Sequence, residues 1–257
     1  MVADDDQTNR AVLRGFFGRW GYHADFARDG QEALAMFDPT IHGLLLIDIH
    51  MPRVDGIALA CAIRGSNKDG AAVPIVALTA DAMLTTRQRS LDAGMNDWLT
   101  KPIDSQALKT AVARWLPQAE SLRRATGHAS GAPPADLQAV DRAIFDWRQV
   151  MEPFGGWTGE ARDFTQDFLR ELPAKMHPLA EAMAAGDQAR ARFAAHALKG
   201  AARTAGAVRL GQVAADLQDC LDAGDMTMAK TFESLLTITS AELEGALRPV
   251  LGDGPGP

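Results

Sequence analysis

Apolar residues follow two patterns along the first 116 positions: short continuous runs, and segments in which they recur at helical spacing. The runs Leu44–Ile47 and Val73–Leu78 are typical of strands buried on both faces, as in a parallel sheet. We expect further strands at residues 21–27 and 97–100, and a short one before Asp4. This alternation of strand and helix predicts a doubly wound α/β domain with a parallel five-stranded sheet over residues 1–116. The expected helices lie at about residues 8–19, 31–37, 56–64, 84–93 and 104–116.

The remainder of the chain has a different pattern. Residues 117–142 lack an apolar period and contain Pro-Pro, Ser-Gly and Gly-Ala pairs, which predicts a linker. Residues 143–251 have only helical periodicity and predict an all-helical four-helix-bundle domain, followed by a disordered tail over residues 252–257. Ala-Gly-Asp recurs at 185–187 and 223–225, where Gly would end one helix and Asp would cap the next. The expected helices lie at about residues 145–153, 158–185, 187–204, 207–223 and 225–248.

Composition narrows the class of protein further. Hydrophobic residues make up 47% and charged residues 23% of the 257 positions, which excludes a disordered chain. The net charge of −7 argues against nucleic-acid binding, which needs clustered Lys and Arg. Cys61 and Cys220 have no C-x-x-C spacing, and no apolar run is long enough to span a bilayer. The chain begins with acidic residues and not with the basic segment of a secretory leader, so we expect it to be cytoplasmic. If the protein is attached to a membrane, we expect the attachment in a part upstream of this chain.

Five candidate side chains occur where the predicted strands end. Asp4 and Asp5 follow the first strand, Asp48 the Leu44–Ile47 run, Thr79 the next run, and Lys101 the last strand. Because ligands bind beyond the carboxyl ends of parallel strands, we expect these residues to share one pocket. Three carboxylates can bind Mg²⁺, and Asp48 can attack a phosphoryl donor. Lys101 would offset the charge that develops on the phosphoryl oxygens.

A second candidate site lies on a predicted helix. His196, Lys199, Gly200 and Arg203 fall on one helical face, and we expect the buried side to hold Phe193, Ala194, Ala197, Leu198, Ala201 and Ala205. An exposed neutral imidazole can attack a phosphoryl group, and Lys199 could steady the resulting charge. Gly200 costs helix stability, which is consistent with close approach by a partner backbone. The alternative is a surface histidine on a basic stripe.

The motifs ADDDQTNR, LLLIDIHMPRVDG, ALTA and LTKPID occur in the order and at the separations found in receiver domains of two-component signalling. Residues 2–116 therefore resemble a receiver domain. The resemblance implies that Asp48 is the phospho-acceptor and that Asp5 ligates Mg²⁺ (or Mn²⁺) directly. It also implies that Asp4 acts mainly through water and that the backbone carbonyl of His50 is a further ligand.

The same resemblance implies roles near the ends of the last two strands. Thr79 takes the position of the switch hydroxyl, and Lys101 that of the phosphate-binding lysine. Trp98 stands where the family places an aromatic side chain, most often Tyr or Phe, that changes rotamer on phosphorylation. The family also has a cis peptide at the position of Lys101–Pro102.

The first strand departs from the family pattern. Receiver domains have a longer apolar run before the acidic pair, whereas only Met1, Val2 and Ala3 precede Asp4 here. The strand is central in the family's 2-1-3-4-5 order, so a truncated first strand is expected to leave neighbouring backbone groups unpaired. We hypothesise that the chain is the C-terminal piece of a longer protein.

The helical half resembles a histidine-phosphotransfer (Hpt) domain over about residues 145–249. The segment AHALKGAARTAGA contains the motif His-x-x-Lys-Gly as His196, Lys199 and Gly200, with Gly206 after it. The resemblance implies that His196 is a second phospho-acceptor. Arg203 stands where the family often has a small polar residue, which would alter the choice of partner.

Together the resemblances imply phosphorelay signal transduction. A kinase phosphohistidine would phosphorylate Asp48, and the group would pass to His196 and then to a downstream response regulator receiver. The chain is similar to the C-terminal part of a hybrid sensor histidine kinase. It shows no glycine-rich ATP-lid pattern, so we do not expect it to phosphorylate itself from ATP. The alternative is a non-catalytic regulatory or docking module with an impaired receiver. A DNA-binding role is disfavoured because no basic recognition helix follows.

Overall fold

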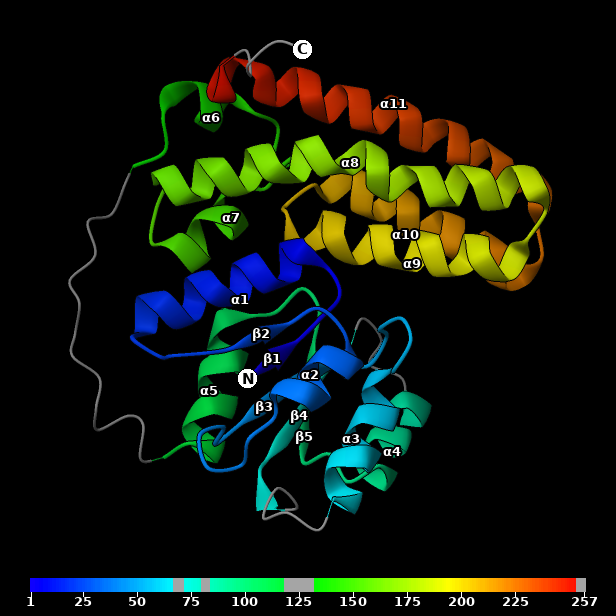
Figure 1. The fold of residues 1–257 in the computed structure, drawn as a ribbon. Helices are drawn as coiled ribbons and strands as arrows, with labels where there is room; N and C mark the ends of the chain where they lie inside the picture. The colour runs from blue at the N-terminus through cyan, green and yellow to red at the C-terminus, as the bar shows by residue number, and fades with distance from the viewer. Residues whose placement is uncertain (67–71, 80–83, 118–131, 253–257) are drawn as a thin grey trace. The chain divides into compact units, whose positions relative to one another are not determined.

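The structure is a computed structural model that describes residues 1–66, 72–79, 84–117 and 132–252. The chain divides into two compact units, residues 1–127 and 128–257 (Figure 1). Over the described residues, no helix combines the length and apolarity that crossing a bilayer requires.

The first unit contains a parallel five-stranded sheet in the order β2-β1-β3-β4-β5. This order confirms the predicted doubly wound α/β fold. Two strands are much shorter than the others, with two residues each, whereas the sequence predicts a strand over the whole of 21–27. The strands are β1 (Val2–Ala3), β2 (Phe26–Ala27), β3 (Leu45–Asp48), β4 (Ile75–Thr79) and β5 (Asp97–Thr100).

Five helices connect and flank these strands, close to their predicted bounds. Four of them begin after an aspartate whose carboxylate accepts a hydrogen bond from the backbone N–H three residues further on. These caps are Asp6, Asp29, Asp55 and Asp104. The helices are α1 (Gln7–Trp20), α2 (Gly30–Met36), α3 (Gly56–Gly65), α4 (Leu84–Asp92) and α5 (Ser105–Trp115).

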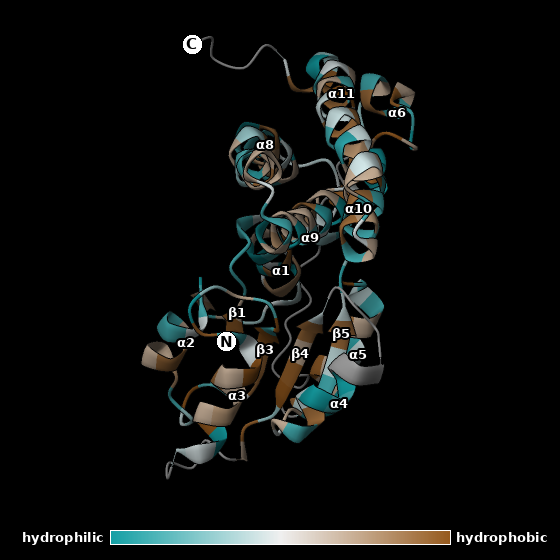
Figure 2. Ribbon diagram, turned by 90° about the vertical axis from the view of Figure 1, so that its right-hand side faces the viewer, coloured by the Kyte–Doolittle hydropathy of each residue, from teal (hydrophilic) through white to brown (hydrophobic). Residues whose placement is uncertain are grey.

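The sheet is buried on both faces, which explains its continuous apolar runs. Leu45 and Ile47 of β3 belong to a core cluster with Leu59 of α3. The residue between them, Leu46, points to the other face, where it lines a small cavity with Phe17 of α1 and Val112 of α5. Figure 2 shows the resulting apolar character of β3 and β4.

β1 is short, as predicted, but the expectation that it would leave neighbouring groups unpaired is wrong. Val2 and Ala3 pair with β2 on one side and with β3 on the other. The N–H of Leu46 donates to the Met1 carbonyl at 3.0 Å, and the Met1 ammonium donates to the Leu44 carbonyl at 2.8 Å. The neighbouring β2 also has two residues, and both residues of β1 pair with it.

The second unit is all-helical over its described residues, as predicted. Its four long helices form a bundle in which α8 packs on α9, α9 on α10, α10 on α11, and α11 on α8 (Figure 1). Gly186 and Gly224 both end a helix in the left-handed conformation, and the next residue, an aspartate, caps the following helix. This confirms the reused Ala-Gly-Asp turn. The helices are α6 (Ala135–Ala139), α7 (Trp147–Phe154), α8 (Gly159–Ala185), α9 (Gln188–Thr204), α10 (Val208–Ala223) and α11 (Met226–Leu251).

The predicted linker over residues 117–142 contains α6, which the sequence did not predict. α6 packs against α11, with Leu137 fully buried. One helical turn offers too few apolar positions to show a period, so the pattern alone does not reveal it. The rest of the predicted linker, residues 118–131, and most of the predicted tail, residues 253–257, lie outside the described residues.

Candidate functional site

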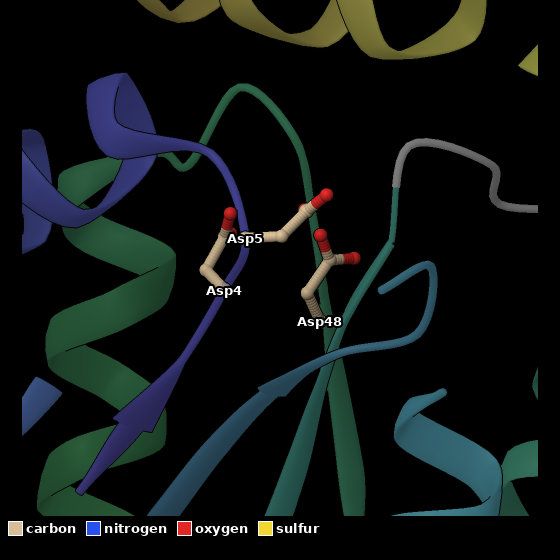
Figure 3. A group of neighbouring side chains, drawn as sticks. All are labelled: Asp4, Asp5 and Asp48. Carbon is tan, nitrogen blue, oxygen red and sulfur yellow. The ribbon is translucent and has the colours of Figure 1, made fainter. Parts of the chain in front are cut away.

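Three carboxylates meet at the carboxyl edge of the sheet in the first unit. Asp4 and Asp5 follow β1, and Asp48 is the last residue of β3, so the strand pairing brings them together (Figure 3). One oxygen from each lies within 4.8 Å of the others. Asp4 is 0% and Asp48 5% exposed, whereas Asp5 is half-buried. Charges buried this closely need a compensating cation.

Lys101 supplies one positive charge to this cluster. Its Nζ lies 2.7 Å from Asp4 Oδ2 and 2.6 Å from Asp48 Oδ2. The residue follows β5, and its backbone N–H donates to the Thr79 carbonyl at 2.7 Å. Thr79 is buried at the end of β4, beside the same edge. The five residues expected to share a pocket therefore gather at one edge of the sheet.

The two carboxylate oxygens of Asp4 have different surroundings. Oδ1 accepts hydrogen bonds from Asn9 Nδ2 at 3.1 Å and from the Asp6 N–H at 3.0 Å. Oδ2 contacts the Lys101 ammonium without hydrogen-bond geometry, so this buried oxygen keeps unused acceptor capacity within the described part of the chain. Asn9 and Arg10, whose Nη1 donates to the Asp4 carbonyl at 2.7 Å, were missed from sequence.

Burial is the largest cause of the raised pKa values of the three carboxylates. It raises the pKa of Asp4 to about 6, against the lowering effect of Lys101. The pKa of Asp5 also rises to about 6, first through burial and then through the charge of Asp4. Burial likewise raises the pKa of Asp48, although Lys101 opposes it. For Lys101, burial acts to lower the pKa, but the Asp4 and Asp48 charges outweigh it and hold the pKa above its ordinary value.

The donor atoms of this cluster are of the kind that binds a divalent cation. The set consists of hard oxygen donors, one of them an under-used buried atom, and Lys101 offsets one of the three carboxylate charges. The donor set therefore fits Mg²⁺ or Mn²⁺. The N–H of His50, two residues beyond Asp48, donates to Asp48 Oδ1 at 3.1 Å. The role of the His50 carbonyl as a ligand stays a prediction.

Trp98 lies in β5, outside the carboxylate cluster. It is partly buried against the apolar core beneath α3, and the Arg87 guanidinium stacks 3.7 Å above its ring centre. Whether its rotamer responds to phosphorylation stays a prediction. The Lys101–Pro102 peptide is cis, as predicted.

In the second unit, α9 presents His196 at the surface. His196 is half-buried and lies three residues after Phe193 and four before Gly200. The sequence placed Phe193 and Ala197 on the buried side, and this is wrong, because Phe193 is 51% exposed and Ala197 is also exposed. Phe193, three residues before His196, lies on the same face as this imidazole, while the other four predicted core residues are buried.

Lys199 and Arg203 lie against α10. Lys199 Nζ donates to Gln218 Oε1 at 2.7 Å. Arg203 covers Gly211, where an added Cβ would come within 2.9 Å of Arg203 Cγ. Gly200, by contrast, has no atom within 4 Å of an added Cβ among the described residues. Gln218 was missed from sequence because it lies on another helix, outside the motif.

Gly206 has a structural requirement for glycine. Its φ is +75°, and an added Cβ would approach the Asp146 carbonyl oxygen to 2.8 Å. The Asp146 N–H in turn donates to the Gly206 carbonyl at 2.8 Å. The second glycine of the motif therefore fixes the end of α9 against the segment that starts α7.

Two protein-family models match parts of the chain. The response regulator receiver domain matches residues 1–113, and the Hpt domain matches residues 163–247. The chain thus belongs to the two-component phosphorelay proteins, with a receiver domain followed by an Hpt domain. Within that class, its curated relatives include hybrid sensor kinases.

The chain is 31% identical over 208 residues to the sensor protein EvgS of Escherichia coli O157:H7, covering 79% of this chain and 15% of that protein. It is 30% identical over 213 residues to the sensor histidine kinase GacS of Pseudomonas protegens, covering 82% and 23%. The chain therefore spans less than a quarter of the length of these relatives. A solved structure, the receiver domain of sensor histidine kinase PA1611 from Pseudomonas aeruginosa PAO1 with a coordinated magnesium ion, is 32% identical. It covers 45% of this chain and 94% of that one, with a TM-score of 0.42.

Proposed function

We propose that the chain passes a phosphoryl group from the phosphohistidine of a sensor histidine kinase to Asp48, then to His196, and then to an aspartate of a separate response regulator. Phosphorelay signal transduction is the function class of its two domains. The observation that supports the route most is the position of Asp48, a buried carboxylate beside two others and 2.6 Å from Lys101 Nζ. We take residues 1–116 and 143–251 as the two functional units, with α6 added to the second.

In the first step, a carboxylate oxygen of Asp48 attacks phosphorus and the phosphorus–nitrogen bond of the donor breaks. The electron pair stays on the donor imidazole, which takes up a proton from water. Lys101 offsets the charge on the phosphoryl oxygens, and the Thr79 hydroxyl donates a hydrogen bond to one of them. Asp5, Asp48 and the His50 carbonyl, with Asp4 through water, would hold Mg²⁺ or Mn²⁺, which when bound adds further charge compensation.

In the second step, a nitrogen of the neutral His196 imidazole attacks phosphorus on Asp48 and a phosphorus–nitrogen bond forms. The phosphorus–oxygen bond to the carboxyl group breaks, the Asp48 carboxylate leaves with the electron pair, and the imidazole releases its N–H proton to water. Lys199, held by Gln218 at 2.7 Å, puts a cation one helical turn from His196. Phe193 is exposed and Gly200 is uncrowded beside this imidazole, which supports docking of a receiver on this face of α9.

Partners follow from this route: a sensor histidine kinase upstream and a response regulator receiver downstream. The larger protein, a hybrid sensor histidine kinase with membrane attachment upstream, is part of the same proposal. Cys61 and Cys220 are both free thiols, which supports a reducing, cytoplasmic compartment for the two domains.

Transfer of labelled phosphate from a phosphorylated kinase in the presence of Mg²⁺ tests the route. Asp48→Asn should abolish label on the chain, and His196→Gln should leave label on Asp48 alone. Aspartyl phosphate is labile to base and histidyl phosphate to acid, so the two adducts are distinguished directly. His177→Gln, a change of an exposed histidine on α8, is the matched control and should behave as wild type. Label that reaches His196 in Asp48→Asn, or never reaches the chain, contradicts the relay; the second result favours a docking module.

A further inference from the structure

Asp4 is held in one orientation by donors that do not belong to the carboxylate cluster. Its Oδ1 accepts from the Asn9 side-chain amide and from the Asp6 N–H, and its Oδ2 is thereby directed to Lys101, 2.7 Å away. Without these two donors, rotation about the terminal torsion of an aspartate is broad. The hydrogen bonds at Oδ1 therefore fix which oxygen faces the cluster.

Both the backbone and the side chain of Asn9 are held by hydrogen bonds. Its backbone N–H donates to the Asp6 carboxylate at 3.1 Å, which caps α1, and its side chain is only 5% exposed. Arg10, the next residue, ties the Asp4 carbonyl to the same helical turn at 2.7 Å. The first turn of α1 is thus a rigid frame for the connection that carries Asp4.

Helix stability does not explain an asparagine at this position. Asn is a poorer helix former than Leu or Ala, and a buried amide must be compensated for the water that it loses. Part of that compensation comes from Asp4, whose carboxylate accepts from Asn9 Nδ2 at 3.1 Å. The bond to Asp4, and not helix propensity, gives a reason for asparagine at this position.

We infer that Asn9 is a positioning residue, which directs Asp4 Oδ2 toward the carboxylate cluster and thereby sets the affinity of that cluster for a divalent cation. The inference rests on the proposed cation site of the relay. Partners that orient a metal-binding group typically change metal affinity by about 10- to 100-fold when removed. Because Asp4 keeps the Asp6 N–H as a second donor, we expect an effect near the lower end, about tenfold.

Asn9→Leu is the variant of choice, because it keeps a side chain of similar size on a helix and removes the amide that donates to Asp4. Asn9→Ala is the second variant, in case the leucine packs badly. Thr8→Val is the matched control, since Thr8 is a neighbouring buried polar residue of α1 without a contact to the Asp4 carboxylate among those described above. Mg²⁺ binding is measured by calorimetric titration of the full chain, and thermal unfolding without Mg²⁺ monitors folding.

We expect Asn9→Leu and Asn9→Ala to raise the Mg²⁺ dissociation constant about tenfold and Thr8→Val to change it less than about twofold. In phosphorylation by acetyl phosphate, saturating Mg²⁺ should restore the maximal rate of Asn9→Leu, because only the cation affinity is impaired. A folded Asn9→Leu with the wild-type dissociation constant overturns the inference, as does a wild-type chain that binds no Mg²⁺. Failure of the relay itself would appear differently, as normal Mg²⁺ binding without label on His196.

Discussion

Lys101 is the residue on which the acidic site depends most in the absence of a cation. Its ammonium contacts two buried carboxylates, Asp4 and Asp48, and both have a pKa raised by burial. A buried charge whose partner is removed loses its compensation while it keeps the cost of desolvation. Removal of any one of the three charges is therefore expected to destabilise the other two.

Replacing Lys101 by Met should lower the free energy of unfolding by about 3–5 kcal/mol at pH 7 without Mg²⁺. Added Mg²⁺ should recover part of this loss, because it supplies positive charge to the same carboxylates. Urea unfolding with and without Mg²⁺ measures both effects. Lys109→Met, an exposed lysine of α5, is the control and should cost less than about 1 kcal/mol. An equally small loss for Lys101→Met would contradict the described ion pairs.

The raised pKa values of Asp4 and Asp5 give the site a defined pH dependence. In the folded chain both carboxyls have a pKa of about 6, above the usual value of 3.8, so the fold favours their protonated forms. Without metal, their contribution to stability is present below about pH 4 and is lost as the pH rises through 6. Mg²⁺ binds the deprotonated forms, so its stabilising effect should grow with pH.

Thermal unfolding from pH 5 to pH 8, in Mg²⁺ and in chelator, measures this dependence. The increase in melting temperature caused by Mg²⁺ should be small at pH 5, rise through about pH 6 and level off above pH 7. An increase that is independent of pH would show that these carboxyls do not titrate in this range.

At the scale of elements, strand ends and helix faces decide where chemistry is placed. Parallel strands bring the acidic residues to one edge, and pairing of α9 with α10 brings Gln218 to Lys199. Sequence periodicity predicts the strands and long helices because their apolar patterns extend over many residues. It cannot predict Asn9 or Gln218, since each acts through a side-chain contact that no spacing rule encodes. α6 is missed because one turn has no period, and Phe193 is assigned to the core only because it is apolar.

Gln218→Leu should slow phosphorylation of His196, because Lys199 loses the acceptor that orients its ammonium. We expect about a tenfold loss in rate, equivalent to about 1.4 kcal/mol, with Asp48 phosphorylated normally. Rapid quenching at early times, followed by separation of acid-labile phosphate, measures the rate. Gln212→Leu, also on α10, pairs with Asp216 and should leave it unchanged. Equal rates for both variants would remove Gln218 from the site.

Substitution of two glycines in the helical unit distinguishes the cost of backbone strain from the cost of steric crowding. Gly186 and Gly206 both have a positive φ, but only Gly206 would bring an added Cβ against a backbone oxygen. Gly186→Ala should therefore cost about 1 kcal/mol of unfolding free energy, and Gly206→Ala about 2–4 kcal/mol. Urea unfolding followed by far-ultraviolet circular dichroism compares them. Similar losses would mean that the Asp146 carbonyl moves aside.

In the molecule as a whole, the proposed relay combines two phospho-acceptor chemistries, one in each unit. A carboxylate in an acidic pocket can accept a phosphoryl group only where cations offset the charge, whereas an imidazole on a helix can accept it at the surface. The order of the two domains could be predicted from sequence, because the motifs of the receiver and Hpt domains are local. The direction of transfer between the units is implied by the family resemblance alone, because it depends on the relative stability of the two phosphorylated forms.

The proposed relay requires that Asp48 is phosphorylated first and that His196 receives the group from it. A rapid-quench time course of the wild-type chain with phosphorylated kinase and Mg²⁺ tests this order. We expect base-labile phosphate on Asp48 to appear without delay and acid-labile phosphate on His196 to follow after a lag, as the Asp48 signal declines. Appearance of phosphate on His196 without a lag, or before any on Asp48, would contradict it.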